Sequence, residues 1–93
     1  MDALALTGVV IKEEDNVFAS LCLELDVASA GESAEEAKNA LFEAVILYIE
    51  TAIESNLPFI RLVPPDEDPR RQAPDTVVTV FPFKVNVAIQ AYA

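Results

Sequence analysis

The chain contains no histidine and a single cysteine among its 93 residues. Without histidine, the commonest general base and the commonest metal ligand are both missing. The lone Cys22 excludes an intrachain disulfide and favours a reducing compartment, and within an apolar segment it is typical of a small core residue. The absence of tryptophan and the presence of only two glycines argue against a turn-rich β-sandwich. These gaps predict a chain with no catalytic, metal-binding or cofactor-binding residue.

Basic residues are also scarce, with six Lys and Arg against 16 Asp and Glu and a net charge of −10. Phosphate backbones repel such a chain, and the pair Arg70-Arg71 is too small a basic patch to offset this, so direct nucleic-acid binding is not expected. An acidic surface suits a basic protein partner, because opposite potentials steer the encounter. The same charge is also explained by the need to keep an apolar chain in solution, and both interpretations stay open.

Long apolar runs are missing as well. The longest uninterrupted one covers residues 44–49, whereas a membrane-spanning helix needs about 20 residues. No basic residue precedes Lys12, so the start of the chain is unlike a signal peptide. We therefore expect no membrane association and a cytoplasmic location.

Apolar residues nevertheless make up 53% of the chain, which predicts one domain over residues 1–93 and some apolar surface covered by another subunit or a partner. Residues 3–11 are almost wholly apolar and predict a strand buried on much of both faces. A polar turn at 12–16 and an alternating segment at 17–26 complete a hairpin, and a short third strand is predicted at 27–30. The residues that share one face of the alternating segment are Val17, Ala19, Leu21, Leu23 and Leu25.

A helix is predicted from Ser33 to about Ser55. Ser33-Ala34-Glu35-Glu36 is a capping box, in which the Ser33 hydroxyl accepts from the amide of Glu36 and the Glu36 carboxylate accepts from the amide of Ser33. Gly31 is expected to take a positive φ at the junction before the helix. Ala37 is expected to pack against the sheet.

The faces of this helix follow from a rotation of about 100° per residue. One narrow face carries a carboxylate stripe, which consists of Glu36, Glu43, Glu50 and Glu54 with Asn39. The opposite face is apolar and consists of Ala37, Leu41, Ala44, Val45, Tyr48 and Ala52. A flank formed by Phe42, Ile46, Ile49 and Ile53 extends the apolar arc beyond what one sheet face covers. This flank is either capped by the segment around Leu57, Phe59 and Ile60 or used in an interface.

The remaining segments complete the fold. Residues 64–75 carry four prolines and six charges and predict an acidic, partly extended loop inside the domain. Residues 76–93 alternate, and Pro82 makes them an edge strand or one with a bulge at that point. The predicted fold class is therefore α+β, a two-layer β-β-β-α-β arrangement in which one long helix packs on an antiparallel three-stranded meander and a fourth strand returns.

This order, together with the sequence at the helix start, resembles the HicB-like antitoxin family. The match runs through Gly31-Glu32-Ser33-Ala34-Glu35-Glu36-Ala37, continues with Asn39 and Glu43-Ala44, and ends at Tyr48-Ile49-Glu50. Upstream, residues 17–25 resemble the aromatic-Ala strand of the family, and the resemblance covers about residues 3–55. Gly31, Ser33, Glu36 and Ala37 all have structural explanations, so the motif indicates the fold and says nothing directly about chemistry.

The resemblance implies a truncated ribonuclease H-like core that neutralises a basic ribonuclease toxin of the HicA type. The chain departs from the family in having Leu23 where a proline is frequent. Many members also carry a DNA-binding domain after the core, and we expect none to follow residue 93 here. Two-metal nucleases of this fold need acids on the first strand, the helix and the fourth strand. Residues 3–11 and 76–90 contain no acid, so Glu43 on the helix would be a lone carboxylate in such a site. We therefore expect that the chain is not an enzyme.

Two functional hypotheses remain. In the first, the chain is an antitoxin-type module that covers a basic HicA-like toxin. In the second, it is an orphan oligomeric domain with a structural or regulatory role and no toxin partner. A homo-oligomer is expected in either case, because the apolar arc of the helix is wide. Its interface is expected to use either the flank of Phe42, Ile46, Ile49 and Ile53 or the edge strand after Pro82. The predicted partner-binding residues are Glu36, Glu43, Glu50, Glu54, Phe18 and Phe42.

Overall fold

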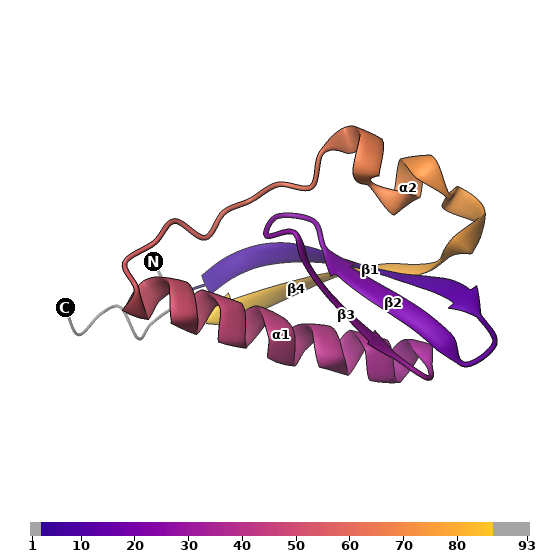
Figure 1. The fold of residues 1–93 in the computed structure, drawn as a ribbon, viewed down its shortest axis with the longest axis horizontal. Coiled ribbons are helices and arrows are strands. Elements are labelled where there is room, and N and C mark those ends of the chain that lie inside the picture. The colour runs from indigo at the N-terminus through magenta and orange to yellow at the C-terminus, as the bar shows by residue number, and fades with distance from the viewer. Residues whose placement is uncertain (1–2, 87–93) are drawn as a thin grey trace.

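The structure, a computed structural model, describes residues 3–86. Within this range four strands form one antiparallel sheet in the order β3-β2-β1-β4, and one long helix covers one face of the sheet (Figure 1). The elements are β1 (Ala3–Glu14), β2 (Val17–Cys22), β3 (Val27–Gly31), α1 (Ala34–Glu54) and β4 (Val77–Asn86). The predicted α+β arrangement, a three-stranded meander with one long helix and a returning fourth strand, is confirmed.

Strand β1 is central and is buried on both faces over its middle, as its apolar sequence predicts. Val9 and Val10 point to opposite faces of the sheet, yet each is at most 1% exposed. The strand runs to Glu14, so the predicted turn at 12–16 is too long. The turn itself is tight and includes Asn16 at φ 61°, a left-handed conformation that asparagine adopts more readily than most residues.

The alternating segment at 17–26 is only partly a strand. Strand β2 ends at Cys22, and a turn that includes Asp26 at φ 54° follows it. The turn swings Leu25 into the core on the side of α1, where it packs with Cys22. The prediction that Leu25 shares a face with Leu21 is therefore wrong, because the backbone leaves the strand conformation before residue 25.

The main core lies between the sheet and α1. Its buried members are Leu6, Val10, Cys22, Leu25, Ala37, Leu41, Val45, Ile49 and Phe81. Phe81 approaches β1 at Gly8, where an added Cβ atom would lie 2.2 Å from the ring. Glycine is therefore required at position 8 for the ring to reach its place in the core. Burial of each such side chain contributes about 1.5–3 kcal/mol.

The start of α1 follows the capping box only in part. The Ser33 hydroxyl accepts a hydrogen bond from the Glu36 amide at 3.0 Å, as predicted. The Glu36 carboxylate, however, accepts from the amide of Glu32 at 3.2 Å and not from that of Ser33. Gly31 has no positive φ. A Cβ atom there would lie 2.6 Å from the Ala37 nitrogen, so the close approach of the first helical turn explains this glycine.

The segment between α1 and β4 lies on the other face of the sheet (Figure 1). It hydrogen-bonds to the β2–β3 turn, because the amides of Arg61 and Val63 donate to the carbonyls of Glu24 and Leu23. The predicted loop at 64–75 contains three short helical turns: η1 (Pro65–Glu67), α2 (Pro69–Gln72) and η2 (Pro74–Thr76). Prolines start these turns because their fixed φ suits the first helical position.

Strand β4 pairs only with β1 among the described strands and forms the edge of the sheet, as Pro82 predicts. The register shift in this pair falls at Val78, between Val77 and Thr79, and not at Pro82. The predicted continuation of this strand through 87–90 lies outside the described residues. Within residues 3–86, no helix has the length and hydropathy that a bilayer crossing requires.

Candidate protein-binding surface

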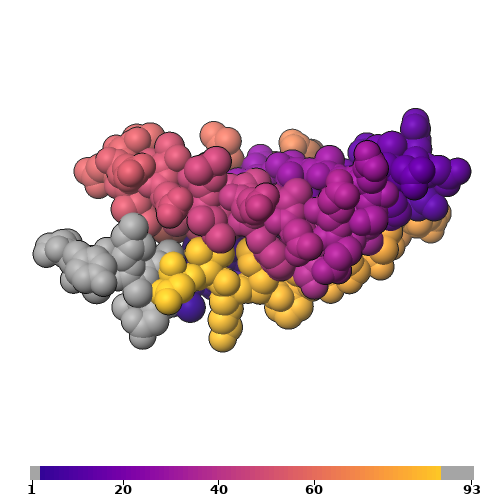
Figure 2. Space-filling view, turned by 90° about the horizontal axis from the view of Figure 1, so that it is seen from below, coloured from indigo at the N-terminus to yellow at the C-terminus, as the bar shows by residue number. Residues whose placement is uncertain are grey.

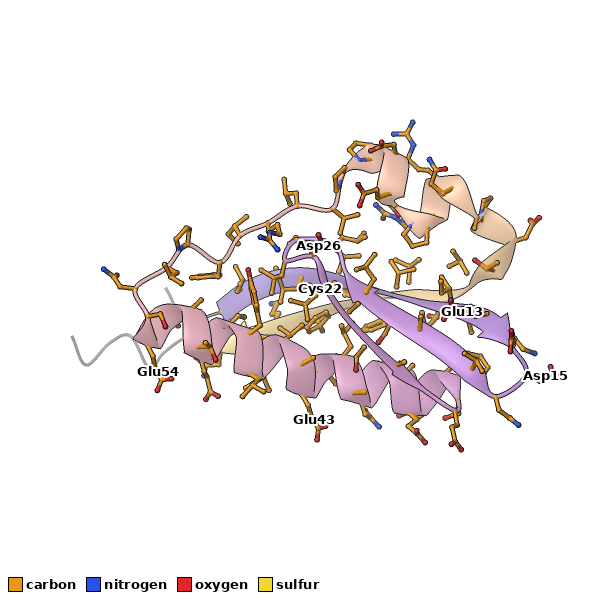
Figure 3. The ribbon with its side chains drawn as sticks, in the orientation of Figure 1. Glu13, Asp15, Cys22, Asp26, Glu43 and Glu54 are labelled. Atoms are coloured by element: carbon orange, nitrogen blue, oxygen red, sulfur yellow. The ribbon has the colours of Figure 1, made fainter. Side chains whose placement is uncertain are left out.

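The carboxylate stripe lies on the outward face of α1. All four of its glutamates are exposed, and Glu43 and Glu54 point away from the sheet (Figure 3). Between residues 3 and 86 the ion pairs are Lys12–Asp15 and Arg70–Asp68, so within this range no stripe residue forms an ion pair. The stripe is therefore available to a cationic partner over much of the length of the helix.

The four glutamates of the stripe are not equivalent. Glu36 is engaged in the helix cap through its hydrogen bond from the Glu32 amide. Glu43, Glu50 and Glu54 accept no hydrogen bond from any described residue. The part of the stripe best suited to external binding therefore runs from the middle of α1 to its C-terminal end.

Phe42 belongs to a cluster of three aromatic rings between α1 and β4. Its ring meets that of Phe81 edge-on, with 5.9 Å between centroids and an interplanar angle of 88°. The Phe83 centroid is 5.1 Å away. Such pairs contribute roughly 0.5–1.5 kcal/mol beyond the area they bury. Phe42 is only half-buried, so it supports the β4 side of the helix and also presents part of its ring to solvent.

An open apolar groove of about 430 Å³ continues from this cluster. We call it the α1–β4 groove. Figure 2 shows α1 and the yellow strand β4 side by side on this face. The helix wall and the strand wall are formed by Phe42, Ile46, Ile49, Glu50 and Ile53 and by Phe83, Lys84, Val85 and Asn86. The groove exists because α1 lies mainly over β3 and β2 and leaves β4 partly uncovered.

The predicted cap over this flank is not present. Phe59 packs against the core, and its carbonyl accepts a hydrogen bond from the Tyr48 hydroxyl at 3.0 Å. Leu57 and Ile60 are more than half exposed, and none of these three residues lines the groove. The segment around residue 59 therefore does not cover this flank, of which Ile49 is buried in the core while Ile46 is 46% exposed.

Phe18, the other predicted apolar anchor, lies elsewhere. It is on β2, half-buried against the core, with the Lys12 ammonium 6.0 Å from its ring centroid. It does not line the α1–β4 groove. The structure therefore brings Phe42 together with Glu50 at one surface and leaves Phe18 outside it.

The sequence points to the strand after Pro82 only as a possible oligomer edge and does not identify its side chains as one wall of a groove. Phe83 and Val85 face the helix, and Lys84 alternates with them. Nearby, the Lys38 ammonium lies 4.8 Å from the Phe81 ring centroid, within reach of a cation–π interaction. The alternation of residues 76–90 contained the signal for this wall, but the lateral position of the helix did not follow from it.

A polar cluster on the opposite face was also missed. The Glu24 carboxylate accepts from the amide and the hydroxyl of Thr7 at 2.7 and 2.8 Å. Asp68 is buried and forms an ion pair of 2.7 Å with Arg70. The hydrogen bond from the Arg70 guanidinium holds the pKa of Asp68 below its usual range, and Asp68 raises the pKa of Arg70. The Arg70 guanidinium is thus paired with a carboxylate of the same chain.

The chemistry of Cys22 is that of a core residue. Its side chain is fully buried, and burial raises the pKa of the thiol to about 11. A thiol in this state is a poor nucleophile at neutral pH. Within residues 3–86, no three Cys, Asp or Glu side chains are grouped so that they could hold a metal ion.

Comparisons with known proteins give no relative for this chain. No protein-family model matches it, no curated protein matches it, and no solved structure matches it. The surface on α1 and β4 is therefore interpreted from its own geometry and charge.

Proposed function

We propose that this chain is a non-catalytic protein-binding module of the antitoxin type, which covers a basic surface of a partner in the cytoplasm. The partner that the HicB-like resemblance implies is a ribonuclease toxin of the HicA type. The observation that carries the proposal is the exposed carboxylate stripe, whose residues Glu43, Glu50 and Glu54 lack a cation within the described chain.

Charge supports a partner of opposite sign. Each unpaired glutamate on an exposed helix raises the electrostatic energy of the folded chain, and a net charge of −10 adds to this repulsion. A cationic surface that docks on the stripe removes this repulsion, and the attraction between opposite charges favours the complex. Binding of DNA or RNA is disfavoured for the same reason, because phosphates carry the same sign as the stripe.

The non-catalytic part of the proposal rests on how the reactive groups are used. The thiol of Cys22 is inside the core, and the Glu24 carboxylate is occupied by Thr7. Histidine is absent from the sequence. A purified sample should cleave neither RNA nor DNA in magnesium or manganese, and cleavage that is lost in Glu43→Ala would contradict this.

The test of partner binding uses a HicA-type toxin encoded beside this chain. Association should be fast at low salt and slow down as salt is added, because the Debye length falls from about 30 Å at 0.01 M to about 8 Å at 0.15 M. The double variant Glu43→Lys/Glu50→Lys should bind more slowly, whereas Glu13→Lys, a change at the distant β1–β2 hairpin, should have little effect. An on-rate that responds neither to salt nor to the double reversal would refute the proposal.

A second candidate is an orphan oligomeric domain with a structural or regulatory role. The observation that favours it is the free edge of β4, where Val78 and Val80 are 47% and 44% exposed. Edge strands offer unpaired backbone groups to a second chain. Light scattering at tens of micromolar decides whether the chain is monomeric, and capture of no basic partner together with a stable oligomer would favour this candidate.

A further inference from the structure

The α1–β4 groove and the carboxylate stripe border each other on the same helix. A helix turns by about 100° per residue, so Ile46 in the groove and Glu50 at its rim are separated by only about 40° around α1. Glu43 is about 60° from Ile46 on the same side. An apolar channel is thus bounded along its helix wall by a line of carboxylates.

From this juxtaposition we infer that the groove anchors a cationic, amphipathic segment of a protein partner, with apolar side chains in the groove and Lys or Arg against Glu43, Glu50 and Glu54. The inference rests on the proposed function and deepens it by naming the chemistry of the partner.

The two halves of the surface have different roles. The carboxylates steer the partner and fix its orientation, but exposed charge pairs add little affinity. The apolar side chains supply affinity, because burial of Ile46, Ile53 and the open part of Phe42 removes apolar surface from water. A segment that is basic but not apolar should therefore bind weakly.

Charge also decides against a second copy of this chain as the occupant. Two copies related by a two-fold axis at the groove would bring their stripes, and two net charges of −10, close together. Lys84 is the one cation among the lining residues, and by alternation it projects to the face opposite Phe83 and Val85. One lysine per copy does not compensate for the glutamates of the stripe.

The test uses the full chain and three fluorescent helical peptides of about 18 residues, long enough to form a helix on binding. The first peptide has leucines along one face and lysines on either side of them. The second has the same composition in an order without a leucine face. The third has glutamates in place of the lysines. We expect the first to bind at least about tenfold more tightly than either of the others.

Two matched variants localise the binding. Ile46→Ser removes from the groove an isoleucine that is 46% exposed. Ile60→Ser removes an isoleucine of similar exposure, 55%, from the segment that follows α1. Ile46→Ser should weaken the first peptide by about tenfold, while Ile60→Ser should change its affinity by less than about twofold. Thermal melts of each variant confirm that it folds.

The outcomes separate the two proposals. If the first two peptides bind equally, respond to Glu43→Lys/Glu50→Lys and ignore Ile46→Ser, the groove is not the anchor and the acidic-face function stands. If Glu43→Lys/Glu50→Lys changes the binding of neither the cationic peptides nor the toxin, the proposed function fails together with the inference. If Ile46→Ser changes only self-association, or if deletion of residues 87–93 is needed before the peptide binds, the occupant is a second copy or the chain's own C-terminal segment, and the inference is overturned.

Discussion

Pro82 of β4 lies directly opposite Thr7 of β1, and the backbone of Thr7 is turned away from it. The Thr7 amide donates to Glu24, and the Thr7 carbonyl accepts from the amide of Leu23. Thr7 and Pro82 therefore form a non-hydrogen-bonded pair, and the missing N–H of Pro82 falls on the free edge of the sheet. Proline at this place loses no ladder hydrogen bond with β1 and interrupts the row of donors that a further strand would use.

This relationship predicts that Pro82 limits self-association. Pro82→Val should restore a donor between the outward-facing backbone groups of Val80 and Lys84, beside apolar side chains that are already exposed. The variant should then form dimers or aggregates at concentrations where the wild type has a lower average molecular mass. Light scattering over a dilution series measures this. Pro58→Val, in the segment after α1, is the control, and equal behaviour of both variants would show that the edge is not what Pro82 protects.

The fold was predictable where one local pattern dominates. The alternation of β4 and the Ser33 cap place the start of each element to within a residue, since each depends on neighbours in sequence. The end of β2 was not predictable from its pattern, because the alternation of leucines continues through a turn. The signal available there in the sequence is the residue type of Asp26, since aspartate adopts a positive φ more readily than most residues, and Asp26 has φ 54°.

The candidate site was only half predictable. The carboxylate stripe follows from helical rotation alone, and all of its glutamates are exposed. The groove depends on where α1 lies across the sheet, and this lateral position depends on packing between elements that are distant in sequence. Partner roles for Phe18 and Phe42 could not be separated in sequence, because both are large aromatic residues in segments that also carry polar residues.

Two serines predict opposite responses to the same substitution. Ser20 is 2% exposed, and its hydroxyl has no hydrogen-bond partner within the described residues. Ser20→Ala should leave the free energy of unfolding unchanged or raise it by up to about 1 kcal/mol, because it removes an unsatisfied buried group. Ser33→Ala should lower it by about 1 kcal/mol, because the hydroxyl caps α1. Urea denaturation measures both, and a loss in Ser20→Ala would reveal a partner for its hydroxyl.

Gly8 and Phe81 should be energetically coupled. A methyl group at position 8 would lie 2.2 Å from the Phe81 ring, so Gly8→Ala should lower the free energy of unfolding by roughly 1–3 kcal/mol. In a Phe81→Leu background the same substitution should cost less, because the smaller side chain leaves space for the methyl group. A double-mutant cycle gives the coupling energy. Additive effects of the two substitutions would show that the ring does not make Gly8 necessary.

The pair of Asp68 and Arg70 predicts a dependence of stability on pH. The pKa of Asp68 is lowered from 3.8 in the folded chain, chiefly by the hydrogen bond from the guanidinium. Its ionised form therefore stabilises the fold at pH values above the unfolded pKa, and this contribution is lost as the pH falls through the lower, folded pKa. Asp68→Asn should cost roughly 1 kcal/mol at pH 7, a modest value because Arg70 is partly exposed.

The same variant should cost progressively less below about pH 4, where the wild-type carboxylate begins to take up a proton. Urea denaturation of both proteins at pH 7, 5 and 3 (values chosen about the unfolded pKa) gives the difference in free energy of unfolding. Many carboxylates of this acidic chain titrate in that range, so the comparison with wild type isolates Asp68. Asp66→Asn, at an exposed neighbour without an ion pair, is the matched control. A cost for Asp68→Asn that is the same at pH 7 and pH 3 would mean that the carboxylate acts through its shape and hydrogen bonds alone and that its charge does not stabilise the segment over β1 and β2.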